Sequence, residues 1–287
     1  MRFARIVVIG AGQIACDCIR CATGLAADRL YVLESAQHQL SLVRNLSNKL
    51  LLPYAAITQE EDIHERLRRM TEHGATLIIS ANNRYLFTPD LIDQPNVEII
   101  NFHYGYLPHY RGMNIPTWTI YNNEPYTGVT WHYVTPEIDH GQIICQEKIP
   151  LGEHTTALNV VRAGMKIGRQ LFIEFIPTLL EQPITGREVV YPDEPVYRFH
   201  QLPGKGLLDI HSDIEAIYRH LRSFDYGRPE LFFPLRVNWE GKTYEVTGYG
   251  RPVISPETDA ISYRDGHVLI VKNGQEISVN VKQIDSL

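Results

Sequence analysis

The sequence reads Arg-Ile-Val-Val-Ile-Gly-Ala-Gly from Arg5 to Gly12. A short β-branched run that ends at glycines predicts a buried strand, a tight turn and then a helix from Gln13. Similar apolar runs alternate with helical patterns farther along the chain. Strands are predicted at 29–34, 76–80, 97–102 and 128–134, and helices at 60–72 and 156–180. This alternation predicts an α/β fold with a doubly wound, mainly parallel, Rossmann-like sheet.

The pattern changes after about residue 186. Residues 191–195 form a turn-rich segment, and one helix is predicted over 212–223. Ser212 is its expected N-cap, because Glu215 follows three residues later and completes a capping-box pattern.

Short alternating strands follow, separated by hairpin dipeptides. These dipeptides are Glu240-Gly241, Asp265-Gly266 and Asn273-Gly274. We therefore expect a first domain over 1–187, a linker over 188–198 and a smaller β-rich, OB-like domain over 199–287.

Composition and charge bound the class of partner. The 287 residues carry 27 Lys and Arg against 33 Asp and Glu, a formal net charge of −6. An acidic chain gains nothing from bulk attraction to a phosphate backbone, so nucleic acid is disfavoured. No apolar run approaches the length of a membrane span, and Ile6–Ile9 is too short for a signal sequence. A cytoplasmic protein without a membrane partner is expected.

Three of the four cysteines, Cys16, Cys18 and Cys21, lie within a predicted helix, and Cys145 stands alone. No second Cys/His pair with zinc spacing follows them, so we expect free thiols and no metal site.

The first candidate site is the glycine turn. Gly10 to Ala15 reads G-x-G-x-x-A after a strand, and Glu34 ends the next strand. This fits the dinucleotide fingerprint, in which glycines admit a pyrophosphate and the acid binds the ribose. An NAD(P)-dependent oxidoreductase is therefore an alternative. A packed α/β sheet requires a similar tight turn without any nucleotide.

The second candidate site follows two other strands. Asn101 and His103 alternate at one strand end, and Asp139 lies in a turn after another. Open α/β sheets bind ligands at the carboxyl ends of strands, so an amide, an imidazole and a carboxylate can converge there. Such a trio suits acyl transfer to an amine: the amide stabilises an oxyanion, and the imidazole moves a proton. A histidine held by local hydrogen bonds is the structural alternative.

Ordered motifs around these residues resemble the 10-formyltetrahydrofolate-dependent formyltransferases. The resemblance is strong over 76–180, looser over 1–75 and weak beyond 200. Peptide-synthetase formylation domains and sugar N-formyltransferases are the most similar groups. The motifs are Asn101-x-His103, Leu107-Pro108, Arg111-Gly112, Gly128-Val129-Thr130 and Asp139-x-Gly141.

The resemblance implies a Rossmann-like catalytic domain, catalysis by Asn101, His103 and Asp139, and 10-formyltetrahydrofolate as the cofactor. Many members read Ser-Leu where this chain has Gly105-Tyr106, and a Gly-Tyr or Tyr-Gly pair where it has Asn82-Asn83. The residues that the resemblance assigns to the pterin pocket are Arg84, Tyr85, Leu86, Phe87, Val134 and Ile138.

The acceptor stays open at this point. Tyr106, Arg111 and Trp118 are candidates for binding it, although bracing of the loop is favoured for Arg111 and core packing for Trp118. Residues 201–287 carry 10 Lys and Arg against 12 Asp and Glu, which disfavours the alternative of a methionyl-tRNA formyltransferase. A small or carrier-bound amine remains: an amino acid, an aminoacyl carrier or a nucleotide-linked amino sugar. A homodimer and a catalytically silent relative also stay open.

Overall fold

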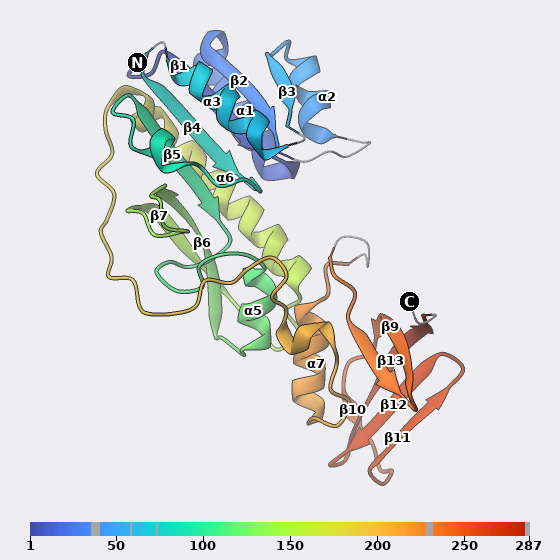
Figure 1. Cartoon of the computed structure of the whole chain (residues 1–287). Helices are drawn as coiled ribbons and strands as arrows, with labels where there is room; N and C mark the ends of the chain where they lie inside the picture. Colours follow the sequence, from blue (N-terminus) through green and yellow to red (C-terminus); the bar gives the residue numbers. More distant parts are fainter. Residues whose placement is uncertain (36–40, 58, 73, 228–231, 285–287) are drawn as a thin grey trace. The chain divides into compact units, whose positions relative to one another are not determined.

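The computed structural model describes residues 1–35, 41–57, 59–72, 74–227 and 232–284 (Figure 1). Contacts divide the chain into two compact units. The first comprises Met1–Gly112, Gly128–Ile149 and Ala163–Val196, and the second comprises Met113–Thr127, Pro150–Arg162 and Tyr197–Leu287.

A seven-stranded sheet with the order β3-β2-β1-β4-β5-β6-β7 forms the centre of the first unit. The first five strands in the chain pair in parallel, whereas β6 runs antiparallel to β5. The predicted mainly parallel sheet is thus confirmed. The strands are β1 (Arg5–Gly10), β2 (Leu30–Glu34), β3 (Tyr54–Ala56), β4 (Thr76–Ala81), β5 (Val97–His103), β6 (Tyr126–Tyr133) and β7 (Ile143–Pro150).

Helices cover both faces of this sheet. Alternate residues of β1 enter different cores, because successive strand side chains point to opposite faces. Ile6 and Val8 pack with α1 and α6, whereas Val7 and Ile9 pack with α3. The helices of this part of the chain are α1 (Gly12–Ala26), η1 (Ala27–Arg29), α2 (Leu42–Lys49), α3 (Glu60–Thr71), α4 (Pro89–Ile92) and α6 (Ala157–Glu181).

An antiparallel sheet dominates the second unit, with the order β11-β12-β13-β9-β8 and β10 paired to β13. All three predicted hairpin dipeptides connect neighbouring strands with positive φ at both positions, as type I′ turns require. The elements are α5 (Ile115–Tyr121), η2 (Pro203–Gly206), α7 (Ile214–Ser223), β8 (Arg236–Trp239), β9 (Lys242–Tyr249), β10 (Val253–Ile254), β11 (Ala260–Arg264), β12 (His267–Lys272) and β13 (Gln275–Gln283).

The two units are not continuous in sequence. The division expected at residues 187–199 assigns α5 and the start of α6 to the first domain, whereas contacts group them with α7. The Leu158 amide donates to the Asp225 carbonyl at 2.8 Å, and the hydroxyls of Thr117 and Tyr226 lie 2.9 Å apart. Local packing therefore overrides chain order here.

Helix α2 is not among the helices that the sequence predicts, and the Ser41 hydroxyl caps its first turn. One local prediction was wrong. Ser212 does not cap α7, because its hydroxyl donates to Asp209 and Asp213 takes the N-cap position.

No helix among the described residues is both long and apolar enough to span a bilayer.

Candidate active site

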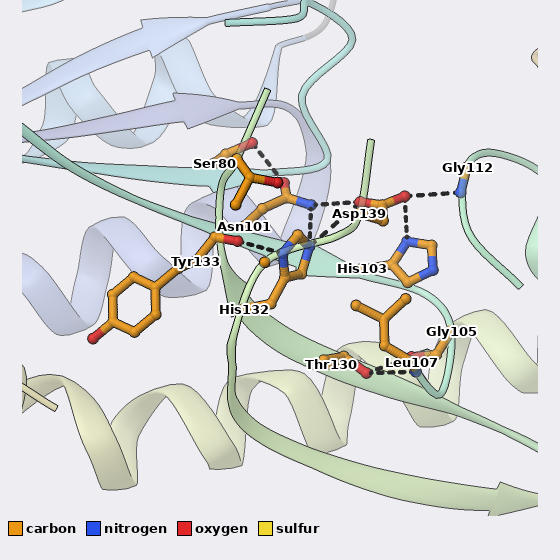
Figure 2. A network of polar contacts seen from close by, with 12 residues as sticks. Ser80, Asn101, His103, Gly105, Leu107, Gly112, Thr130, His132, Tyr133 and Asp139 are labelled. Carbon is orange, nitrogen blue, oxygen red and sulfur yellow. Dashed lines mark hydrogen bonds and ion pairs between the residues drawn. The ribbon is translucent and has the colours of Figure 1, made fainter. Parts of the chain in front are cut away.

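Strand register brings the polar residues of the second candidate site together. Asn101 on β5 lies beside Ser80 on β4 and beside His132 on β6. His103 is two residues farther along β5, on the same face. Asp139 follows β6 in a left-handed conformation, with φ of 48°. The sheet and one following loop thus deliver five polar side chains to one place (Figure 2).

Asp139 is the centre of this network. Its Oδ2 lies 3.3 Å from Nδ1 of His103 and accepts the Gly112 N–H at 2.8 Å. Its Oδ1 lies 3.3 Å from Nε2 of His132. The carboxylate, whose side chain is 11% exposed, is therefore flanked by one imidazole on each oxygen.

Burial and charge oppose each other in this cluster. Burial alone raises the pKa of Asp139, but the charge of His103 and the Gly112 N–H hold that pKa well below its usual range. Burial lowers the pKa of His103, and the charge of Asp139 opposes that shift only in part. The site therefore holds an ionised carboxylate beside a histidine that resists protonation.

His103 has a partner at each ring nitrogen. Nε2 lies 2.8 Å from the Tyr110 carbonyl oxygen. A carbonyl only accepts, so Nε2 carries the hydrogen and Nδ1 faces Asp139. The contact between Nδ1 and the Asp139 carboxylate becomes attractive when Nδ1 is protonated.

Asn101 is held from three sides. Its Oδ1 accepts the Ser80 hydroxyl at 2.7 Å. Its Nδ2 lies 3.1 Å from Nε2 of His132 and donates to Oδ1 of Asp139 at 3.4 Å. Nδ1 of His132 lies 2.8 Å from the Tyr133 carbonyl oxygen.

Sequence reasoning did not include Ser80, His132 or the backbone groups of Tyr110 and Gly112 in the site. The signal for His132 was its place in a strand that packs beside Asn101. That signal becomes visible only with the antiparallel register of β5 and β6, which no local pattern specifies.

The two segments assigned to the pterin pocket meet on one apolar cluster. Tyr85, Phe87 and Val134 all pack, partly buried, against the core between the sheet and α3. The side chain of Leu86 is 59% exposed, and Ile138 is half-buried. The backbone of this segment is held locally, because the Asn83 side chain bonds both the N–H and the carbonyl of Tyr85, and His64 lies 3.2 Å from the Leu86 carbonyl oxygen. Arg84 is exposed at the start of this segment.

The three residues assigned to the acceptor are divided between the two units, and each has contacts of its own. Arg111 donates to the Glu194 carbonyl at 3.1 Å and lies 5.7 Å from the Tyr191 ring, which is a bracing arrangement. Tyr106 lies in the first unit, 5.1 Å from Nζ of Lys148. Trp118 belongs to the second unit and packs against Tyr197 at a tilt of 32°, with 4.7 Å between the ring centroids.

Packing accounts for the glycine turn. A β-carbon at Gly10 would lie 1.8 Å from the Ala81 carbonyl oxygen, so the close approach of β1 and β4 requires glycine there. The hydroxyls of Ser41 and Tyr54 each donate to the buried Glu34 carboxylate at 2.6 Å. Glu34, the acid expected to bind a ribose, is therefore hydrogen-bonded within the protein.

Among the described residues, no three His, Cys, Asp or Glu side chains gather in a way that could hold a metal ion. All four cysteines are free thiols. Cys16 and Cys18 are buried, and Cys21 and Cys145 are half-buried.

The fold and this cluster agree with a known family. A family model described as formyl transferase matches residues 26–176, more than half of the chain. The chain belongs to the formyl transferase family. It is 29% identical over 157 residues to the bifunctional polymyxin resistance protein ArnA of Wigglesworthia glossinidia brevipalpis. That match covers 54% of this chain and 24% of ArnA, so the chain spans about a quarter of this relative's length.

Solved structures share the fold over nearly the whole chain. WlaRD, a sugar 3N-formyl transferase crystallised with dTDP and 5-N-formyl-THF, superposes with a TM-score of 0.72 at 16% identity, covering 99% of this chain and 98% of that one. The N-formyltransferase from Helicobacter canadensis, in complex with folinic acid and dTDP-3-aminofucose, gives a TM-score of 0.73 at 16% identity, with coverage of 97% and 99%.

Proposed function

We propose that this chain transfers a formyl group from 10-formyltetrahydrofolate to the primary amine of a nucleotide-linked amino sugar. The contact of Asp139 with His103 and Asn101, on a formyl transferase fold, is the observation that carries this proposal. The partly covered surface at Tyr85, Phe87 and Val134 supports folate as the donor.

When bound, the formyl folate supplies a formyl carbon that an amine can attack. Asn101 and His103 would stabilise the negative charge that develops on the formyl oxygen, since each carries N–H groups at this strand end. The Nε2–H of His103 donates to the Tyr110 carbonyl, and it would have to exchange that acceptor for the formyl oxygen.

A proton must leave the attacking nitrogen as its new bond forms. His103 is the group suited to hold this proton, because Asp139 lies 3.3 Å from its Nδ1 and stabilises the imidazolium. Asp139 thus orients the ring and compensates its charge. A proton returned from His103 to the departing folate nitrogen balances the reaction.

The acceptor class rests on fold neighbours. WlaRD is a sugar 3N-formyl transferase, and the Helicobacter canadensis enzyme was crystallised with dTDP-3-aminofucose. Both superpose on at least 97% of this chain. We infer the same class of acceptor here, and a cytoplasmic location in keeping with four free thiols. A carrier-tethered acceptor and a homodimer stay predictions.

The test is an acceptor panel. The full chain is incubated with 10-formyltetrahydrofolate and, in parallel, with a dTDP-linked amino sugar, a free amino acid and an aminoacyl carrier. Mass spectrometry should detect the formylated sugar nucleotide and release of tetrahydrofolate. Preferential formylation of the amino acid or the carrier would contradict the acceptor class, and the absence of any formylated amine would contradict the transfer.

A further inference from the structure

The Asn101 amide is fixed by two groups other than Asp139. The Ser80 hydroxyl donates to Oδ1 at 2.7 Å, and Nε2 of His132 lies 3.1 Å from Nδ2. The Nδ2 contact with Asp139 is longer, at 3.4 Å. Hydrogen bonds weaken with length, so the N–H that faces Asp139 is the one that exchanges most easily for another acceptor.

The orientation of His132 follows from its second nitrogen. Nδ1 lies 2.8 Å from the Tyr133 carbonyl oxygen, which can only accept, so Nδ1 carries a hydrogen. In the neutral ring Nε2 is then a lone pair, and it accepts one Nδ2–H of Asn101. The ring is 2% exposed, so water does not compete for this contact.

Protonation would reverse this arrangement. A hydrogen on Nε2 would donate to Oδ1 of Asp139, 3.3 Å away, and would face the N–H of Asn101. Among the described residues the ring also lies near His103, with 6.4 Å between the two ring centroids, and the charge of Asp139 acts on Tyr191 as well. His132 can therefore orient Asn101 only while it is neutral.

We propose that His132 and Ser80 are positioning residues for Asn101. They hold the amide so that one Nδ2–H of Asn101 keeps its hydrogen bond to His132. The other Nδ2–H then leaves Asp139 and donates to the formyl oxygen. This inference rests on the proposed function. His132 acts through Asn101 and touches neither the donor nor the acceptor.

The first experiment compares His132→Phe, His132→Gln and Ser80→Ala in the full chain, with His267→Gln as a control at an exposed histidine in the second unit. His132→Phe keeps a ring but removes the acceptor. It should lower kcat by about 10- to 100-fold, below the full effect of losing an oxyanion donor, with KM for the formyl folate within about threefold. Ser80→Ala should lower kcat by a smaller factor.

The glutamine variant separates positioning from simple packing. Its side-chain oxygen can accept from Asn101 as Nε2 of His132 does, so His132→Gln should recover much of the activity that His132→Phe loses. A His132→Phe enzyme that keeps more than half of the wild-type kcat would overturn the proposal. A glutamine variant that is no more active than the phenylalanine variant would also overturn it.

A second measurement needs no turnover. ¹⁵N spectra of the wild-type chain should show neutral His132 with hydrogen on Nδ1 only. Addition of 5-formyltetrahydrofolate should shift one of the two Asn101 side-chain N–H signals, and this selective shift should disappear in His132→Phe. Hydrogen on Nε2 at neutral pH, or equal shifts in both proteins, would overturn the proposal. Absence of formylated product with a positive spectrum would contradict the proposed function alone.

Discussion

A β-carbon at position 105 would lie 2.3 Å from Nε2 of His103 and 3.0 Å from the Tyr110 carbonyl oxygen. The histidine ring therefore occupies space that only glycine leaves free. The ring is buried there, and its Nε2–H is donated to Tyr110. Many formyltransferases that this chain resembles have serine at the corresponding place. In this chain the position of the His103 ring depends on Gly105.

Substitution of Gly105 by alanine tests this relationship. The added methyl group must displace the His103 ring or the backbone at Tyr110, so we expect at least a tenfold loss of kcat. Gly24→Ala is the matched control, since a β-carbon at this helical position contacts nothing within 4 Å. It should keep activity and be slightly more stable. Full activity of the Gly105 variant would show that the ring position is unimportant.

The carboxylate of Asp139 should control the basicity of His103. Its charge raises the pKa of His103 against the effect of burial, so Asp139→Asn should lower that pKa further. Turnover should fall because the imidazolium loses its compensating charge. NMR titration of the His103 ring in both proteins measures the shift. An unchanged or higher pKa in the variant would contradict this electrostatic account.

The second unit should lose stability in mild acid. Burial lowers the pKa of His220 from 6.5 to about 4. The unfolded chain therefore binds a proton below pH 6.5 that the folded chain takes up only near pH 4, so stability falls as the pH decreases across this window, by up to about 3 kcal/mol.

His220→Phe should flatten that dependence, because the ring packs against Tyr121 and Phe224 and phenylalanine does not titrate. Urea unfolding at several pH values between 4 and 7 measures it. If the unfolding free energy depends on pH equally in the wild type and the variant, His220 is not the cause of the acid destabilisation.

Substitution of Arg111 tests whether this side chain braces its loop or binds the acceptor. If it braces the loop through the Glu194 carbonyl, Arg111→Ala should cost about 1 kcal/mol of stability and leave KM for the acceptor within about threefold. A tenfold higher acceptor KM with unchanged stability would assign this residue to substrate binding instead.

Much of the fold could be predicted because its signals are local. The strand and glycine turn from Arg5 to Gly12, and the hairpin dipeptides such as Asn273-Gly274, each specify a backbone conformation within a few residues. Short elements such as α2 and β3 contain too few residues for a hydrophobic period to be recognised.

The site was predictable only in part. The alternation of Asn101 and His103 follows from strand geometry, so their shared face could be expected. The place of His132 depends on which residue of β6 lies opposite Asn101, and that register is set by packing over the whole sheet. The contact of Asp139 with both histidines likewise depends on the loop path after β6.

Formylation by the wild type and by His103→Ala tests the central claim most directly. Both proteins are given 10-formyltetrahydrofolate and the dTDP-linked amino sugar, and product is measured by mass spectrometry while binding of 5-formyltetrahydrofolate is measured by calorimetry. The account predicts formylated product from the wild type, at least a 100-fold slower reaction in the variant, and similar folate binding in both. Near-full activity of His103→Ala, or no product from the wild type, would contradict it.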